Sequence, residues 1–223
     1  MRLEGNGLAY RHGRGPWLFR GASLSVGEGE LVGLSGPSGC GKTTLARLLA
    51  GFERPLEGRV TIGGRPIPDR GYCPVQLVLQ HPEQAVNPRW RIKRTLTEGW
   101  RPGPDMLDAL GIQPGWLERW PSELSGGELQ RICIARALGP DTRFLISDEM
   151  TTMLDAITQA QIWNAVLDIA GKRGLGVLVV SHDAGLLSRV CDRVVRWEEL
   201  AAPSSSPQAQ GGINRASLET ERP

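Results

Sequence analysis

Short apolar runs alternate with amphipathic segments along most of the chain. Runs bounded by glycine or polar residues predict strands, and they lie at residues 31–34, 58–64, 75–79, 144–147 and 175–180. Leucine, isoleucine and alanine recur at helical spacing in the segments that predict helices, at residues 44–50, 128–138 and 156–170. Strands that alternate with helices indicate a mainly parallel sheet with helices on both faces, and therefore an α/β fold.

Three other regions have a different pattern. Residues 1–30 are punctuated by glycines and predict short strands in an antiparallel meander. Tryptophans among prolines and arginines begin near residue 87, and we interpret residues 87–138 as an inserted helical subdomain with packing tryptophans. Residues 201–223 are rich in serine and proline, which predicts a disordered tail after a domain at residues 1–200.

The last predicted helix has residues typical of a helix start and of a helix end. Asp155 is a typical N-cap, and Gly171 is a typical helix stop. Between them, the spacing predicts that one face is turned inward, with the residues Ile157, Ala160, Trp163, Val166 and Leu167.

Composition limits the classes of function. The 223 residues include 26 basic and 24 acidic ones, so the net charge of +2 provides no strong field for nucleic acid or an acidic membrane. The four cysteines are scattered without a Cys-x-x-Cys pair, which argues against zinc and disulfides and favours a reducing cytosol. No apolar run approaches the roughly 20 residues of a membrane span, so we expect no direct span and a membrane role only through a partner.

A glycine-rich segment with the spacing of a phosphate-binding loop follows the first apolar run. It reads Gly36-Pro37-Ser38-Gly39-Cys40-Gly41-Lys42-Thr43. Glycines let backbone N–H groups turn toward an anion, and the next helix adds the positive end of its dipole. We expect Lys42 to reach the outer phosphates and the Thr43 hydroxyl to bind Mg²⁺. The alternative is a glycine-rich turn that matches by chance.

Polar residues follow three further predicted strands. Asp148 is placed to hold Mg²⁺ and Glu149 to polarise an attacking water, although Asp-Glu after a strand is also a common solvated loop start. His182 is placed to contact a γ-phosphate, and Gln80 to reach the metal or the water. Ligands of open α/β sheets bind at this edge, so we expect these side chains to meet there.

A second glycine-rich helix start has no role in a generic phosphate-binding protein. In the segment Leu124-Ser125-Gly126-Gly127-Glu128, Ser-Gly-Gly precedes a predicted helix and makes another anion-binding N-terminus. One nucleotide already has its loop. We therefore expect two chains to pair head to tail, each presenting this segment to the nucleotide held by the other.

Together these motifs resemble the ATP-binding cassette (ABC) ATPases, over residues 3–197 in family order. The resemblance identifies residues 36–43 as the Walker A loop followed by Thr44, Gln80 as the Q-loop, residues 124–128 as the signature, Asp148 and Glu149 as Walker B and the catalytic glutamate, Asp155 as the D-loop aspartate, and His182 as the switch histidine. It also implies that Tyr10 stacks on adenine, unless that ring only packs. Met150 and residues 151–153 differ from the usual sequence of the family, at positions whose side chains take no part in catalysis.

Residues 79–89 resemble the Q-loop of the peptide/nickel importer ATPases, and their sequence is most similar to that of the nickel-type subunits. This resemblance implies an ATP- and Mg²⁺-dependent ATPase on the cytoplasmic face of the membrane. It also implies a second, different ATPase chain, two permeases and an extracytoplasmic binding protein as partners. Nickel, another chelated metal or short peptides stay open as cargo. The alternatives are an ABC ATPase acting on nucleic acid or ribosomes, and a small-molecule kinase that shares only the phosphate loop.

Overall fold

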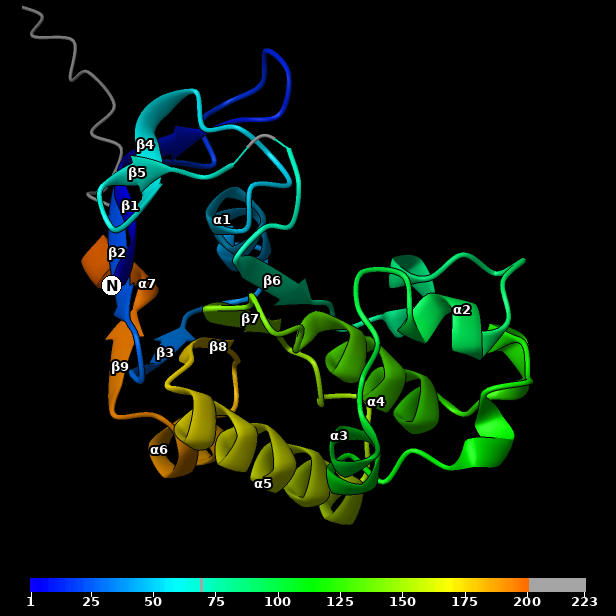
Figure 1. Ribbon diagram of the computed structural model, residues 1–223. Helices are drawn as coiled ribbons and strands as arrows, with labels where there is room; N and C mark the ends of the chain where they lie inside the picture. Colours follow the sequence, from blue (N-terminus) through cyan, green and yellow to red (C-terminus); the bar gives the residue numbers. More distant parts are fainter. Residues whose placement is uncertain (69, 201–223) are drawn as a thin grey trace, which may run out of the picture.

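The structure, a computed structural model, describes residues 1–68 and 70–200 and contains two sheets (Figure 1). The larger sheet has five parallel strands in the order β6-β7-β8-β3-β9. Its strands are β3 (Leu31–Ser35), β6 (Val75–Val78), β7 (Phe144–Asp148), β8 (Gly176–Val180) and β9 (Arg193–Arg196). The parallel core predicted from the sequence is therefore confirmed.

The smaller sheet is antiparallel, with the strand order β2-β1-β4-β5. Its strands are β1 (Arg2–Tyr10), β2 (Phe19–Gly27), β4 (Glu57–Ile62) and β5 (Arg65–Pro66). The N-terminal region was expected to form short strands, but β1 and β2 are nine residues each. Gly5 and Gly7 do not end a strand, because a register shift between Gly5 and Leu8 absorbs them within β1.

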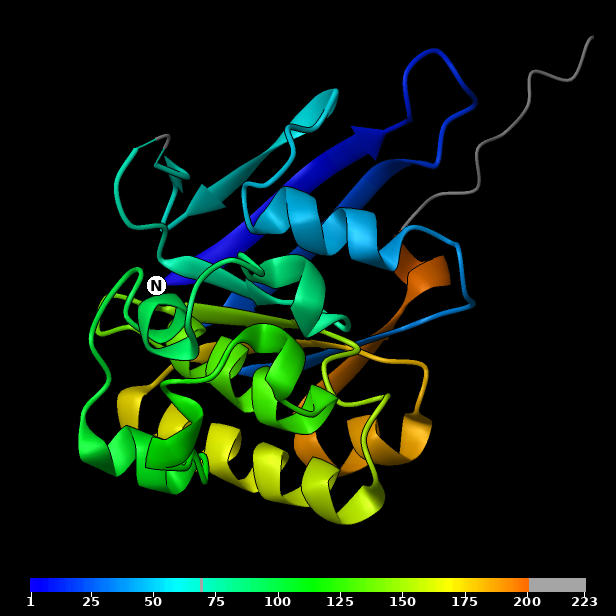
Figure 2. The same ribbon diagram turned by 90° about the vertical axis from the view of Figure 1, so that its right-hand side faces the viewer.

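Helices cover both faces of the parallel sheet (Figure 2). Helix α1 (Lys42–Leu49) lies between the two sheets and buries Leu45, Leu48 and Leu49 there. The opposite face is covered by α4 (Gly126–Ala137), α5 (Ala156–Arg173) and α6 (Ala184–Val190), and α7 (Trp197–Leu200) follows β9. Strands β7 and β8 are buried along their whole length, which explains their continuous apolar sequence.

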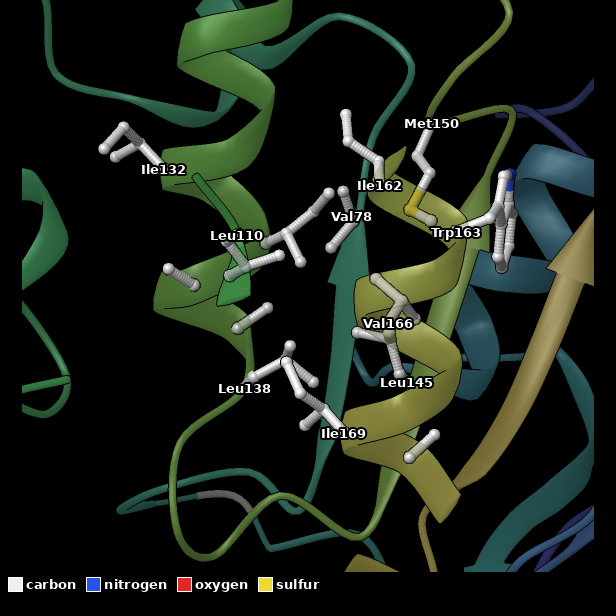
Figure 3. Close-up of a cluster of buried hydrophobic side chains, with 14 of the residues drawn as sticks. Val78, Leu110, Ile132, Leu138, Leu145, Met150, Ile162, Trp163, Val166 and Ile169 are labelled. Atoms are coloured by element: carbon white, nitrogen blue, oxygen red, sulfur yellow. The ribbon is translucent and has the colours of Figure 1, made fainter. Parts of the chain in front are cut away.

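The face of α5 that turns inward differs from the prediction. Its buried residues are Ile162, Trp163, Val166, Ile169 and Ala170, which pack with Val78, Leu145 and residues of α4 (Figure 3). Ile157 is 73% exposed and Ala160 is also exposed, because both lie on the side of α5 that carries the exposed residues Gln161, Asn164 and Asp168. The helix ends at Gly174, with φ 63°, and not at Gly171.

Short helical elements occupy the region between β6 and α4. They are η1 (Pro82–Ala85), α2 (Ile92–Leu96), α3 (Pro104–Ala109), η2 (Pro114–Trp116) and η3 (Pro121–Glu123). The indole N–H of Trp100 donates to the carbonyls of Ala135 and Arg136, and Trp90 and Trp120 each carry an arginine guanidinium on the ring. The tryptophans thus make packing contacts, as expected. The division into a domain at 1–200 with a subdomain at 87–138 stays a prediction, and the tail at 201–223 lies outside the described residues.

Candidate functional site

The register of the parallel sheet brings the predicted site residues together. Leu34 of β3 and Asp148 of β7 both pair with Val180 of β8, so the three strands end side by side. The phosphate loop follows β3, Glu149 follows β7 and His182 follows β8. Gln80 follows β6 at the edge of the same sheet. The carboxyl edge of the sheet therefore gathers residues from four strands, as the sequence predicted.

A cavity of about 350 Å³ lies over the phosphate loop. It is lined by His12, Leu18, Ser38, Gly39, Gly41, Lys42, Thr43, Thr44, Gln80 and Glu149. Gly39 and Gly41 have φ values of 78° and 115°, in the region that favours glycine and turns backbone N–H groups toward one side. Backbone N–H groups, the N-terminus of α1 and a cation in one cavity make a site that fits a polyphosphate.

The Lys42 ammonium is held inside the loop that precedes it. The side chain is 6% exposed, and Nζ donates to the carbonyls of Gly36 and Pro37, each at 2.8 Å. Cys40 Sγ lies 3.9 Å from the same nitrogen. Gly36 and Pro37 thus reach the site through their carbonyls and do not line the cavity.

Asp148 lies beneath this cavity and is 5% exposed. Burial raises the pKa of its carboxyl group, while a hydrogen bond with the Thr43 side chain works in the opposite direction. The Thr43 hydroxyl, the Asp148 carboxylate and the Gln80 amide oxygen are hard oxygen donors close to one cavity. Oxygen donors of this kind suit Mg²⁺, so the residues present fit that ion.

Glu149 and His182 form a pair at the strand ends. His182 Nδ1 lies 3.1 Å from Glu149 Oε1. Glu149 has φ 50°, the one left-handed value among the described non-glycine residues. Its backbone N–H donates to the Val180 carbonyl at 3.0 Å, and the Thr152 hydroxyl donates to its carbonyl at 2.6 Å. A strained backbone held by two hydrogen bonds aims the carboxylate at the cavity over the phosphate loop, where it can accept a proton.

The second glycine-rich segment starts α4 with reciprocal hydrogen bonds. The Glu128 N–H donates to Ser125 Oγ at 3.3 Å, and the Ser125 N–H donates to Glu128 Oε2 at 2.7 Å. Asp155 caps α5 in a similar way, and hydrogen bonds from the Thr158 side chain and backbone lower the pKa of its carboxyl group. Ser125, Gly127, Glu128 and Asp155 line a further cavity that shares no lining residue with the one over the phosphate loop.

Seven of the predicted site residues line neither cavity, namely Tyr10, Gly36, Pro37, Cys40, Gly126, Asp148 and His182. Gly126 lies beside the second cavity without lining it. Tyr10 lines neither; its ring meets His12 edge-on with centroids 5.2 Å apart, and a hydrogen bond with Glu53 raises the pKa of its hydroxyl. His12 and Leu18, which sequence reasoning missed, line the cavity over the phosphate loop. These two residues lie on either side of the glycine-rich turn after β1. That turn was the sequence feature from which their place in the site could have been predicted.

Two further observations bear on the class of protein. Within residues 1–68 and 70–200, no group of three or more His, Cys, Asp or Glu side chains is arranged to hold a metal ion. Over the same described residues, every helix is too short or too polar to cross a membrane.

Comparison with known proteins gives consistent findings. Residues 19–152 match the family described as "ABC transporter". The nickel import ATP-binding protein NikE of Rhodospirillum rubrum is 39% identical over 80% of this chain and 71% of its own length. The NikE protein of Escherichia coli K12 is 33% identical over 86% of this chain and 82% of its own.

Solved structures show the same fold. A dimeric, post-hydrolysis ATP-binding cassette bound to ADP and Pi has a TM-score of 0.73 at 23% identity, over 87% of this chain and 93% of its own. A structure described as the ATP binding subunit of an ABC transporter has a TM-score of 0.74 at 20% identity, over 88% of this chain and 85% of its own.

Proposed function

Because the chain belongs to the ABC transporter family and is an ABC-type ATPase, we propose that it is the ATP-hydrolysing subunit of an importer for nickel or a nickel chelate. One observation carries the proposal: the phosphate-loop cavity and the cavity beside Ser125 are two separate parts of one chain. Each is half of a nucleotide site, so ATP is enclosed when two cassettes meet head to tail.

The phosphate loop binds the substrate ATP in this proposal. Backbone N–H groups at Gly39 and Gly41 receive the phosphates, and Lys42 exchanges its loop carbonyls for phosphate oxygens. Thr43, Asp148 and Gln80 hold Mg²⁺, which neutralises phosphate charge when it is bound. The raised pKa of Asp148 follows from its burial, and a cation is what makes its carboxylate favourable there.

Hydrolysis requires a water aimed at the γ-phosphorus. Glu149 accepts a proton from that water as its oxygen bonds to the γ-phosphorus and the bond to the β-γ bridging oxygen breaks, releasing ADP and phosphate. His182, 3.1 Å from the Glu149 carboxylate, holds that carboxylate in line and presents its other ring nitrogen toward the γ-phosphate. The left-handed backbone of Glu149 fixes the geometry before substrate arrives.

The partner cassette completes the site. Ser125 and Gly127 at the N-terminus of α4 approach the nucleotide held by the partner, and the positive end of the α4 dipole favours its phosphate charge. Asp155 lies in the same cavity and joins the contact. We propose that the partner is a second, different ATPase chain, as the peptide/nickel resemblance implies. Tyr10, next to His12, stays proposed as part of the adenine pocket.

A groove between the parallel sheet and α4 offers a surface for a permease. It measures about 450 Å³ and is lined by Phe52, Tyr72, residues 76–79, Pro82 and Arg136 among others. Phe52 is 70% exposed at its rim, an apolar side chain that a docked segment would cover. Residues 79 and 82 belong to the segment that contains Gln80, so a permease bound here senses the nucleotide site. Two permeases and an extracytoplasmic binding protein complete the proposed importer, with this chain on the cytoplasmic face.

Nickel is favoured over peptide by the printed names of the relatives and by the wording of residues 79–89. Neither observation involves a residue that would touch cargo, so the assignment needs a transport assay. An ATPase acting on nucleic acid or ribosomes gains no support from the relatives.

The test is uptake in the native host carrying Glu149→Gln, followed with labelled nickel, labelled cobalt and a labelled dipeptide. The substitution keeps the size of the side chain and removes its basicity, so ATP still binds while turnover stops. Glu57→Gln, an exposed carboxylate on β4, is the matched control. Loss of nickel uptake alone supports the proposal, and loss of dipeptide uptake alone moves the chain to the peptide branch. Unchanged uptake of all three compounds overturns the importer assignment.

A further inference from the structure

A buried glutamine joins α4 to the segment that carries Gln80. Gln130 is 1% exposed and lies one turn after the Ser125 cap. Its Nε2 donates to the Leu79 carbonyl at 3.1 Å, across 51 residues of sequence. Leu79 directly precedes Gln80, which lines the cavity over the phosphate loop. A single hydrogen bond therefore links α4, the helix that begins after Ser125, to the residue next to Gln80 in the cavity over the phosphate loop.

A second contact with α4 holds the segment 79–82 at its other end, Pro82. Cys133 lies three residues after Gln130, on the same face of α4, and its Sγ is 3.9 Å from the Pro82 carbonyl. The buried thiol has a pKa raised to about 11 by burial, so it stays a neutral, weak donor. Gln80 and His81 thus lie between two points at which α4 holds the backbone. A shift of α4 along or about its axis must move Gln80.

The other end of α4 faces the proposed partner. The helix has 12 residues, starts at the Ser125 cap, and has Gly127 and Glu128 in the second cavity. A hydrogen-bonded helix of this length moves as a unit. A displacement at Ser125, caused by the nucleotide of the partner cassette, therefore reaches Gln130 in little more than one turn.

The hydrogen bonding of Gln130 argues for a role other than stability. Within the described residues, its Oε1 is buried and has no hydrogen-bond partner. A buried acceptor without a partner opposes folding, and a methionine of similar length would fill the same space without that penalty. What the amide adds over an apolar side chain is the single hydrogen bond to Leu79.

We propose that Gln130 is a positioning residue that couples the Ser125 end of α4 to Gln80, so that docking of the partner cassette aligns Gln80 in this chain's own nucleotide site. The inference rests on the proposed function, because it requires a partner nucleotide at Ser125. It adds a named link by which one half-site controls the other. Gln130 acts through Gln80 and does not touch ATP.

The experiment is a double-mutant cycle between Gln130→Met and Gln80→Ala. ATP hydrolysis is measured in the complex that the tagged chain forms in its native host. Thr95→Val is the matched control, because it also removes a fully buried polar group without a partner among the described residues, from a helix packed on α4. Glu149→Gln reports separately on the proposed function. Gln130→Leu replaces the methionine variant if that protein does not fold.

We expect Gln130→Met to lower about tenfold the part of kcat that Glu149→Gln removes, while leaving KM for ATP within about twofold of the unmodified protein. In the Gln80→Ala background it should have no further effect, because the group that it positions is gone. Thr95→Val should leave both constants unchanged. An unchanged kcat for Gln130→Met, or the same loss in both backgrounds, overturns the inference. If Glu149→Gln also leaves hydrolysis unchanged, the proposed function fails with it; if Glu149→Gln abolishes this chain's share of hydrolysis, only the coupling fails.

Discussion

His182 Nδ1 lies 3.1 Å from Glu149 Oε1, although 33 residues separate them in the sequence. The pairing of Asp148 with Val180 in the parallel sheet brings the ends of β7 and β8 together, and each residue lies just beyond its strand. The relationship is thus a consequence of strand register. It places a basic ring against the carboxylate that we propose to activate water.

His182→Ala should lower ATP hydrolysis at this chain's own site about a hundredfold, and so remove nearly all of the activity that Glu149→Gln removes, because the carboxylate of Glu149 loses the ring that orients it. ATP affinity should change little, since the phosphate loop is untouched. His81→Ala is the matched control: its Nδ1 also pairs with a carboxylate, Glu83 Oε1 at 3.2 Å, on the surface. Steady-state ATPase assays and equilibrium binding of a fluorescent ATP analogue distinguish the two effects. Equal rates for both variants would remove His182 from the mechanism.

Ser125→Asp separates helix capping from nucleotide contact. Aspartate is as good an N-cap as serine, so the melting temperature should stay within a few degrees of that of the unmodified chain. A carboxylate facing the partner's phosphates should nevertheless repel them and lower ATP hydrolysis at the partner's phosphate loop about tenfold or more. Ser125→Asn, a neutral residue with the same capping ability, should keep most of the activity. Equal activity of the two variants would contradict a phosphate at this helix end.

Glu30 predicts a pH dependence of stability. Burial alone would raise the pKa of its carboxyl group, but hydrogen bonds from Arg193 and the Gly27 N–H outweigh it and lower the pKa from 4.5. A folded pKa below the unfolded value gives stability that is present above about pH 4.5 and lost as the pH falls through the folded value.

Glu30→Gln should therefore reduce the free energy of unfolding by about 1–2 kcal/mol at pH 7, with a smaller difference below about pH 4. Glu57→Gln removes an exposed partner of Arg20 and should cost less than about 1 kcal/mol at either pH. Urea unfolding at both pH values measures the two differences. A Glu30→Gln effect that grows on acidification would contradict the assignment.

Much of the fold could be predicted because local pattern and tertiary structure agree there. Strands β7 and β8 are buried on both faces, and their sequences are continuous apolar runs. The prediction that Ile157 faces inward was wrong, because Ile157 lies on the side of α5 that carries the exposed Gln161, Asn164 and Asp168. An apolar residue near the start of a helix does not by itself show which side of the helix is buried. Strand β9, with mostly exposed residues and arginine at both ends, gave no strand signal.

The site residues could be predicted wherever a local motif, such as a glycine-rich loop or the end of a strand, fixes their position. Lys42, Thr43, Asp148, Glu149 and Gln80 all lie where strand ends and glycine spacing predicted them. His12 was missed because its place depends on how the turn after β1 folds over the phosphate loop. The link from Gln130 to Leu79 was missed for a similar reason, since a contact over 51 residues leaves no local pattern.

We propose that this chain hydrolyses ATP through Glu149 in a site shared with a second cassette. The most direct measurement is the rate of ATP hydrolysis by the complex that the tagged chain forms in its native host, with and without Glu149→Gln. We expect the rate to fall by about half or more, with ATP remaining bound, because the site held by this chain's phosphate loop can no longer activate water. An unchanged rate would mean that the catalytic carboxylate lies elsewhere and would rule out this role of Glu149.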